Sequence, residues 1–354
     1  MPGRSAAARI AEKSGRALLR AGLAVGAVLW LLSMFPAAAQ AHGPVNPVAS
    51  SYIARIKSLP AGLEAKVVDG DLRMWLRVHR GASVVVLDYR GAPYLRFARG
   101  QIWVNRNSEM FYLNQTPTVY PPAGLRRTTR RHWVDVGTGD SYEWHDARLH
   151  ALALEAIAPG ASYVGQWRIP LVVNGRPTAI VGGVWYRGAP SIVWFWPILV
   201  IVLCALAAWR LRDARVDTAL ARAISVVTLL AIMVAVIGRD LHGRPGLSVS
   251  GVFELAVITA LVVWAAWRVA RNRARGFTFL LISVAALWEG ATLIPTLLHG
   301  YVLLAVPAFL GRLAAVICLG GGIALVLLAV RLFEAQDDED LADPAGDEVA
   351  RIAA

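Results

Sequence analysis

The chain has 354 residues, of which 56% are hydrophobic and 17% are charged, and its formal net charge is +12. Its mean hydropathy of +0.50 is too high for a soluble enzyme, so much of the chain is expected in lipid. The positive charge does not indicate nucleic-acid binding, because many arginines stand beside apolar spans, where the positive-inside rule places them. We therefore predict a membrane protein that has no nucleic-acid partner.

Residues 1–41 have the pattern of a secretory signal peptide. Arginines precede the apolar run Ala21–Phe35, and the small residues Ala39 and Ala41 follow it. A signal peptidase recognises small residues at this spacing, which predicts cleavage after Ala41 and a mature chain that begins with His42. The alternative is an uncleaved anchor, although the apolar run is short for a membrane span.

Residues 42–190 are predicted to form an all-β sandwich outside the cytoplasm. Short runs of alternating apolar and polar residues indicate strands, and pairs such as Asp69-Gly70 and Arg99-Gly100 indicate the turns between them. Turns at this spacing are typical of a β-sandwich. Tyr163–Val173 and Thr178–Tyr186 are expected to close the domain as a hairpin.

Residues 191–333 are predicted to form an all-α bundle of five transmembrane helices. Each apolar span is near or above the length that a bilayer core requires. The five spans are Ile192–Ala208, Ala219–Ile237, Val249–Trp267, Phe277–Leu298 and Val302–Leu332. Both cysteines, Cys204 and Cys318, fall inside these spans, so no disulfide is expected in the sandwich.

The arginine distribution predicts the orientation in the cell membrane. Arginines crowd the first and third connections between spans, and the fourth connection contains no Lys or Arg. The two basic connections are therefore expected in the cytoplasm, with the sandwich outside and the C-terminus inside. Residues 334–354, which carry the acidic run Asp337–Asp340, are predicted to be a disordered cytoplasmic tail.

The predicted mature N-terminus suggests a metal site. An N-terminal histidine offers one metal ion both its α-amine and its imidazole, and nitrogen ligands of this kind favour Cu(II). His42 is therefore a candidate copper ligand. The alternative is that a histidine follows the cleavage site by chance.

Partners for His42 are expected in the segment Tyr142–His150, which has the densest group of ligand-type residues in the chain. His145 and His150 are the candidate ligands, and Asp146 is a candidate axial ligand or a group that orients an imidazole. On a straight strand Asp146 and His150 share one face and His145 points to the other, so the three meet only if the segment bends. The alternative is a surface strand whose histidines cap the backbone or stack on Trp144.

The membrane half contains a predicted polar cluster. Ionisable groups inside apolar spans are costly unless they are paired or face water, so Glu254, Glu289 and Arg312 are expected to be paired. In the predicted orientation all the polar groups lie toward the outer side and can meet beneath the sandwich. They form either a polar pocket that receives an ion or a ligand from the sandwich, or a Glu–Arg pair that fixes helix register. The cluster consists of Asp240, His242, Glu254, Glu289, His299 and Arg312.

Two resemblances carry functional implications. The strands Tyr163–Ile169 and Gly183–Tyr186, with the turn Asn174–Pro177, resemble the end of copper-resistance proteins of the C type (CopC-like). That resemblance implies an Ig-like sandwich with an N-terminal copper-binding histidine. Those proteins place an aspartate and a histidine in the final hairpin where this chain has Asn174 and Arg176, so only His42 maps onto their site.

The second resemblance covers most of the mature chain. The segment Trp144-His145-Asp146-Ala147-Arg148-Leu149-His150, the Trp-x-Ile-Pro strand and a Trp-rich first helix resemble uncharacterised actinobacterial membrane proteins. This resemblance implies no known activity.

Two leading functions remain open at this stage, and a bilayer-embedded enzyme that would use Glu289 and His299 on one water-accessible face ranks third. The first is a membrane-anchored copper-binding protein of copper homeostasis or transfer, which would exchange metal with a donor or acceptor protein. The second is a non-metal sensor or assembly protein whose sandwich binds a protein or an envelope polymer through the basic run Arg126–Arg131. The chain has no nucleotide-binding glycine loop, nucleophile elbow or zinc-protease motif, so no enzyme activity is predicted.

Overall fold

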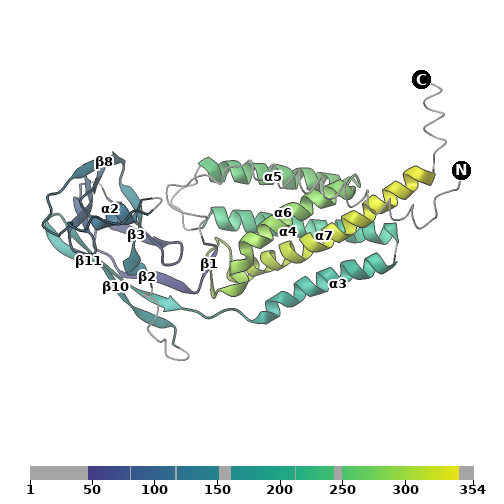
Figure 1. Ribbon diagram of the computed structural model, residues 1–354, viewed down its shortest axis with the longest axis horizontal. Helices are drawn as coiled ribbons and strands as arrows, with labels where there is room; N and C mark the ends of the chain where they lie inside the picture. Colours follow the sequence, from purple (N-terminus) through teal and green to yellow (C-terminus); the bar gives the residue numbers. More distant parts are fainter. Residues whose placement is uncertain are drawn as a thin grey trace, which may run out of the picture.

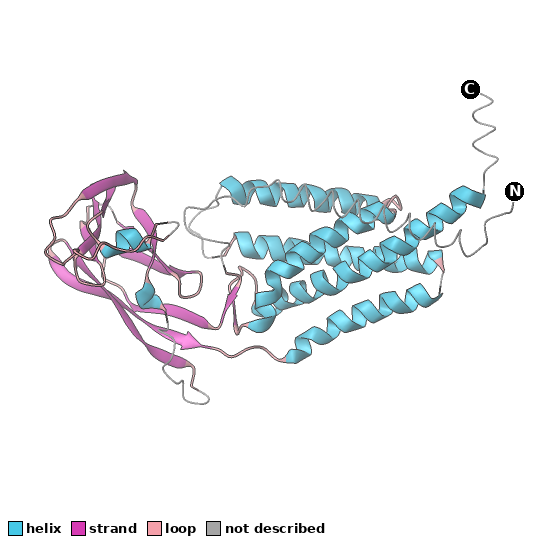
Figure 2. Ribbon diagram, in the orientation of Figure 1, coloured by secondary structure: helices cyan, strands magenta, loops and turns pink. Residues whose placement is uncertain are grey.

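The computed structural model describes residues 47–79, 81–115, 118–150, 161–211, 213–242 and 249–342. A domain of β-strands lies at one end of the molecule, and long helices form the other end (Figure 1). The strands gather mainly in one part and the long helices in the other, although short helical segments also lie within the sheet domain (Figure 2). This order confirms the predicted sheet domain followed by helices. The predicted signal peptide and His42 lie outside the described residues.

The larger sheet has seven antiparallel strands in the order β2-β11-β10-β5-β6-β7-β8. Its edge strand β2 pairs with the last strand of the domain, so the first and last parts of the domain lie side by side. The strands are β2 (Tyr52–Ser58), β11 (Arg176–Tyr186), β10 (Tyr163–Val173), β5 (Val84–Leu87), β6 (Pro93–Ala98), β7 (Gln101–Asn105) and β8 (Trp133–Thr138). The short helix α2 (Glu109–Leu113) follows β7.

The smaller sheet has three strands in the order β3-β4-β9 and faces the larger sheet across one core. Its strands are β3 (Leu63–Val68), β4 (Arg73–Val78) and β9 (Ser141–His145). The buried side chains of this core include Met74, Leu76 and Trp144 from the smaller sheet and Val86, Leu95 and Ile169 from the larger one. Alternation along each strand sends these apolar side chains inward, which is why the sequence pattern identified the strands.

The predicted closing hairpin is confirmed. β10 and β11 pair from Tyr163 opposite Trp185 to Val173 opposite Arg176. Asn174 and Gly175 form the turn with φ values of 49° and 81°, a left-handed conformation that Asn and Gly adopt at low cost. The division into sheets of seven and three strands differs from that of immunoglobulin domains, so the Ig-like identity of the domain stays a prediction.

Five helices are long and apolar enough to cross a membrane. They are α3 (Trp196–Leu211), which the 3₁₀ turn η2 (Ile192–Phe195) precedes, α4 (Ala214–Asp240), α5 (Val249–Ala270), α6 (Gly276–Leu298) and α7 (Ala308–Ala342). Large apolar side chains such as Leu203, Leu230 and Val263 are exposed on these helices, as contact with lipid requires. The chain therefore has the architecture of a multi-pass membrane protein.

The start of the fifth predicted span was wrong. Tyr301–Val302 forms the strand β12, which pairs with β1 (Ala49–Ser50), and α7 begins only at Ala308. Pro307 lacks a backbone N–H and restricts the preceding residue, so the apolar residues before it do not extend the helix. At its other end α7 continues to Ala342, so the first part of the segment predicted as a disordered tail is helical.

Helix α7 packs against α3, α4 and α6 through three successive glycines. A Cβ atom at Gly320 would lie 3.1 Å from the Cα of Ile198 in α3, and one at Gly322 would lie 2.7 Å from Leu287 Cγ in α6. A Cβ at Gly321 would collide with Thr228 of α4. The three glycines therefore let three helices approach α7 at one level.

Candidate functional site

The segment Trp144–His150 bends sharply at the end of β9. Trp144 is buried in the core, and Asp146 N donates to the carbonyl of Leu72, the residue just before β4, at 3.2 Å. The 3₁₀ turn η1 (Ala147–Leu149) then reverses the chain. This turn returns His150 to the side of His145, which is the bend that convergence of the two imidazoles requires.

The two imidazoles face each other through their Nε2 atoms, which are 3.4 Å apart. The ring centroids are 5.0 Å apart with an interplanar angle of 42°, so the rings are tilted rather than stacked. On the other side of His150, Nδ1 lies 3.5 Å from Oδ2 of Asp71. A carboxylate at Nδ1 fixes the orientation of the ring and leaves Nε2 directed at His145.

The sequence did not predict Asp71 as part of this site. Asp71 follows the Asp69-Gly70 turn between β3 and β4, and that segment was interpreted only as a turn. The signal lies in the strand pairing, because Arg73 of β4 stands opposite His145 of β9 and brings the turn beside the histidine. Only the order of strands in the sheet reveals this proximity.

Among the described residues Asp146 forms no hydrogen bond with either imidazole, so its expected role as the group that orients an imidazole is corrected. Its Oδ1 accepts from Arg148 N at 3.1 Å and from Arg148 Nε at 2.8 Å. Its Oδ2 accepts from Trp144 Nε1 at 2.9 Å and from Arg148 Nη2 at 2.7 Å. These four bonds occupy the fully buried carboxylate, which organises the turn that carries His150 instead of facing a metal.

The environment of His145 favours the neutral imidazole. Burial, and then the neighbouring His150, lower the pKa of His145 below its ordinary value. A neutral imidazole keeps a lone pair that can bind a metal ion. Among the residues that the structure describes, however, no group of three or more His, Cys, Asp or Glu side chains is arranged to hold a metal ion. A third ligand would have to come from elsewhere.

This lowered pKa predicts a pH dependence for the metal-free protein. Between the lowered pKa and the ordinary value, the unfolded chain binds more protons at His145 than the folded chain does, so His145 makes the protein less stable as the pH falls through that window. NMR titration of the His145 ring protons should give a lower midpoint in the folded protein than in the urea-unfolded chain. An equal or higher midpoint in the folded protein would contradict this expectation.

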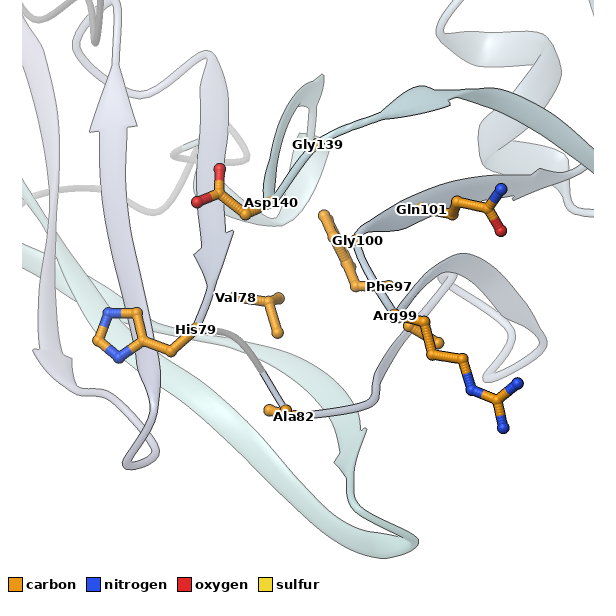
Figure 3. Close-up of a pocket in the computed structure, with 11 residues that line it drawn as sticks. Val78, His79, Ala82, Phe97, Arg99, Gly100, Gln101, Gly139 and Asp140 are labelled. Carbon is orange, nitrogen blue, oxygen red and sulfur yellow. The ribbon is translucent and has the colours of Figure 1, made fainter.

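A hollow at the opposite end of β4 also carries a histidine, but its geometry is unsuitable for a ligand site (Figure 3). Its volume is about 40 Å³, close to the space of a single water molecule. The side chains of His79 and Arg99 point away from it (Figure 3). The exposed His79 lies 3.4 Å from Glu64, as expected for a surface residue.

The predicted intramembrane cluster separates into two groups. Glu254, Glu289 and Asp240 surround Arg239, whose Nη1 donates to Glu289 Oε2 at 3.0 Å. The acids are therefore ion-paired, as expected, but their partner is Arg239 and not Arg312. The sequence pattern did not identify Arg239 as a member of the cluster, because it lies at the end of its apolar span, where arginines usually face water.

The second group lies where the bundle meets the sheet domain. Arg312 donates through Nε to Thr296 O at 2.9 Å and through Nη2 to Gly300 O at 3.0 Å, so it satisfies carbonyls at the end of α6. His299 Nδ1 lies 3.0 Å from Ser51 Oγ of the sheet domain. His242 is hydrogen-bonded to the backbone of Leu304. These three side chains fix the junction rather than form a cluster with the acids.

Comparisons with protein-family models, with curated proteins and with solved structures gave no match. The functional argument therefore depends on the arrangement of the residues.

Proposed function

We propose that this protein binds copper outside the cytoplasm through His145, His150 and the processed N-terminus at His42, and that it acts in copper homeostasis or transfer. The observation that carries the proposal is the facing pair of imidazoles. Two nitrogens that bind one tetrahedral ion at about 2.0–2.1 Å are ~3.3 Å apart, and a planar ion places them ~2.9 Å apart. The Nε2 separation of 3.4 Å is close to the first value and needs only a small side-chain adjustment for the second.

Asp71 supports the same interpretation. Metal-binding histidines usually donate their second ring N–H to a carboxylate or a carbonyl. Asp71 occupies that position at His150, and it is largely buried. Without a metal ion, the facing Nε2 atoms can share one N–H···N hydrogen bond, and a bound ion would replace that proton.

For His42 to join the pair, the segment before Pro47 must reach it. Ser50 lies beside Gly70, because a Cβ at Gly70 would be 3.3 Å from Ser50 Cβ, and Asp71 is the next residue. The five residue steps from Pro47 back to His42 span up to ~17 Å. A processed His42 would add an amine and an imidazole to the two nitrogens of the pair, and such a nitrogen set favours Cu(II) over other divalent metals.

The test is Cu(II) binding to the full-length processed protein in nanodiscs, followed by electron paramagnetic resonance. We expect a spectrum with nitrogen couplings, and His145→Ala or His150→Ala should lower the affinity at least 100-fold. Asp71→Asn should lower it about 10–100-fold, because the carboxylate acts only through His150. His79→Ala is the matched control and should bind as the wild type does.

Two results would overturn the proposal. The first is Cu(II) binding that is equally tight in the wild type and in the His145→Ala/His150→Ala double variant. The second is the absence of binding in a protein whose N-terminus is shown by mass spectrometry to be His42. If the mature chain begins at another residue and the pair still binds, His42 is not a ligand and the assignment is limited to the imidazole pair.

The basic run supports the competing function, a binding module for an anionic envelope polymer. Arg126, Arg127, Arg130 and Arg131 are all exposed in the loop before β8. Polyanion binding through this loop would be lost when these arginines are changed to Gln and would not depend on His145 or His150. The same set of variants therefore separates the two functions.

A further inference from the structure

The intramembrane contacts of Arg239 join three helices at the end of the bundle nearest the sheet domain. Arg239 of α4 forms ion pairs with Glu289 of α6 and with Glu254 of α5, and its Nε lies 3.7 Å from Asp240 Oδ1. The neighbouring Gly238 O accepts a hydrogen bond from Ala305 N, just after β12, which places the group close to the junction. Arg239, Asp240, Glu254 and Glu289 are called the arginine cluster below.

The arginine cluster contains more negative than positive charge. Glu254 and Glu289 share one guanidinium, so these three groups sum to −1 when all are ionised. The described groups that face Glu289 are Arg239 and Asp240 from α4, Glu254 from α5 and the thiol of Cys318 from α7. None of them adds a second positive charge. Uncompensated charge in a medium of low dielectric constant is costly, so the cluster favours uptake of a cation.

Glu289 is the member at which that uptake is expected. Its side chain is 1% exposed, whereas that of Glu254 is 46% exposed and can remain hydrated. Glu289 Oε2 accepts from Arg239, but Oε1 is buried and has no hydrogen-bond partner among the described residues. A carboxylate oxygen that is buried without a donor is unfavourable when ionised and much less so when neutral.

A proton fits this position better than a metal ion does. Hard cations require a shell of several oxygen ligands, whereas a proton requires one lone pair. Glu289 offers one unpartnered oxygen, because its other oxygen is committed to Arg239. The added proton forms an O–H bond on the carboxylate, comes from water and requires no other reactant.

We infer that Glu289 is a proton-binding site inside the membrane domain, positioned by Arg239, and that it is protonated at neutral pH. This site is independent of copper binding and lies on a different part of the chain.

Infrared difference spectroscopy of the full-length protein in nanodiscs tests the inference. The wild type at pH 7 should show the carbonyl stretch of a protonated carboxyl group, with the small shift that deuterium exchange produces. Glu289→Gln should lose this band, because it keeps the size of the side chain and an acceptor for Arg239 but has no carboxyl group. Glu289→Asp should retain a band at a shifted frequency.

Two matched variants assign the band. Glu254→Gln removes the exposed acid of the same cluster, and Asp217→Asn removes a buried acid of α4 that lies 3.7 Å from Arg331. Both should retain the band. The inference is overturned if the wild type shows no protonated carboxyl at pH 7, if the band survives in Glu289→Gln, or if exchange of sodium for potassium removes it.

Discussion

Replacement of Asp146 by Ala should destabilise the sheet domain by about 3–5 kcal/mol, the usual cost of leaving one partner of a buried ion pair alone. Arg148 is 15% exposed and its partner Asp146 is fully buried. Without the carboxylate, the guanidinium loses two charge-assisted hydrogen bonds and Trp144 Nε1 loses its acceptor. The turn η1 should then loosen, so that His150 is no longer held beside His145.

Thermal unfolding of the full-length protein, followed by tryptophan fluorescence, measures this effect. Asp140→Ala is the matched control, because Asp140 is exposed and its contact with Arg77 at 3.6 Å contributes little. The double variant Asp146→Ala/Arg148→Met should recover part of the loss, since it no longer contains a buried unpaired charge. Equal unfolding temperatures for Asp146→Ala and Asp140→Ala would show that the buried pair does not stabilise the domain.

The parts of the fold that the sequence predicted are those that local patterns specify. The turn at Asn174-Gly175 and the alternation on both sides of it were sufficient for the β10–β11 hairpin, because a two-residue turn fixes its register. The long apolar runs identified the helices for a similar reason, since a span in lipid must satisfy its backbone internally. Neither inference depends on a distant part of the chain.

The parts that were not predicted depend on residues far apart in the sequence. Tyr301 and Val302 are apolar enough for a helix, and only their pairing with Ala49 and Ser50 makes them a strand. Asp71 belongs to the histidine site because β4 lies between β3 and β9. Arg239 pairs with acids on two other helices, and no spacing within its own segment indicates those partners.

Asp146 illustrates a different limit of prediction from the sequence. The sequence places one carboxylate next to two candidate ligands, which is typical of a metal site. It also places an arginine two residues later, and a buried carboxylate binds a nearby guanidinium in preference to a neutral imidazole. The competition between Arg148 and the histidines decides the role of Asp146, and only the geometry of the turn resolves it.

The second large expected effect comes from substitution of a glycine in the glycine triplet of α7. Gly321→Leu should prevent correct assembly of the bundle, because even a Cβ at this position collides with Thr228 of α4 and a leucine side chain would push the helices apart. Overpacking of a well-packed interior costs about 1–3 kcal/mol or more when the backbone must move. Here the backbone of α7 is also held by α3 at Gly320 and by α6 at Gly322, so it cannot shift without loss of another contact.

The outcome is measured on detergent-solubilised protein in two ways. The first is the fraction that elutes as a monodisperse species, and the second is the unfolding temperature. Ile323→Phe is the matched control, since Ile323 lies on the same helix with 39% of its surface exposed and a larger side chain there meets lipid. We expect Ile323→Phe to behave as the wild type and Gly321→Leu to be lost largely to aggregation. Gly321→Ala should lie between them, because it adds one methyl group. A Gly321→Leu protein as stable as Ile323→Phe would mean that α4 does not approach α7 as closely as the structure indicates.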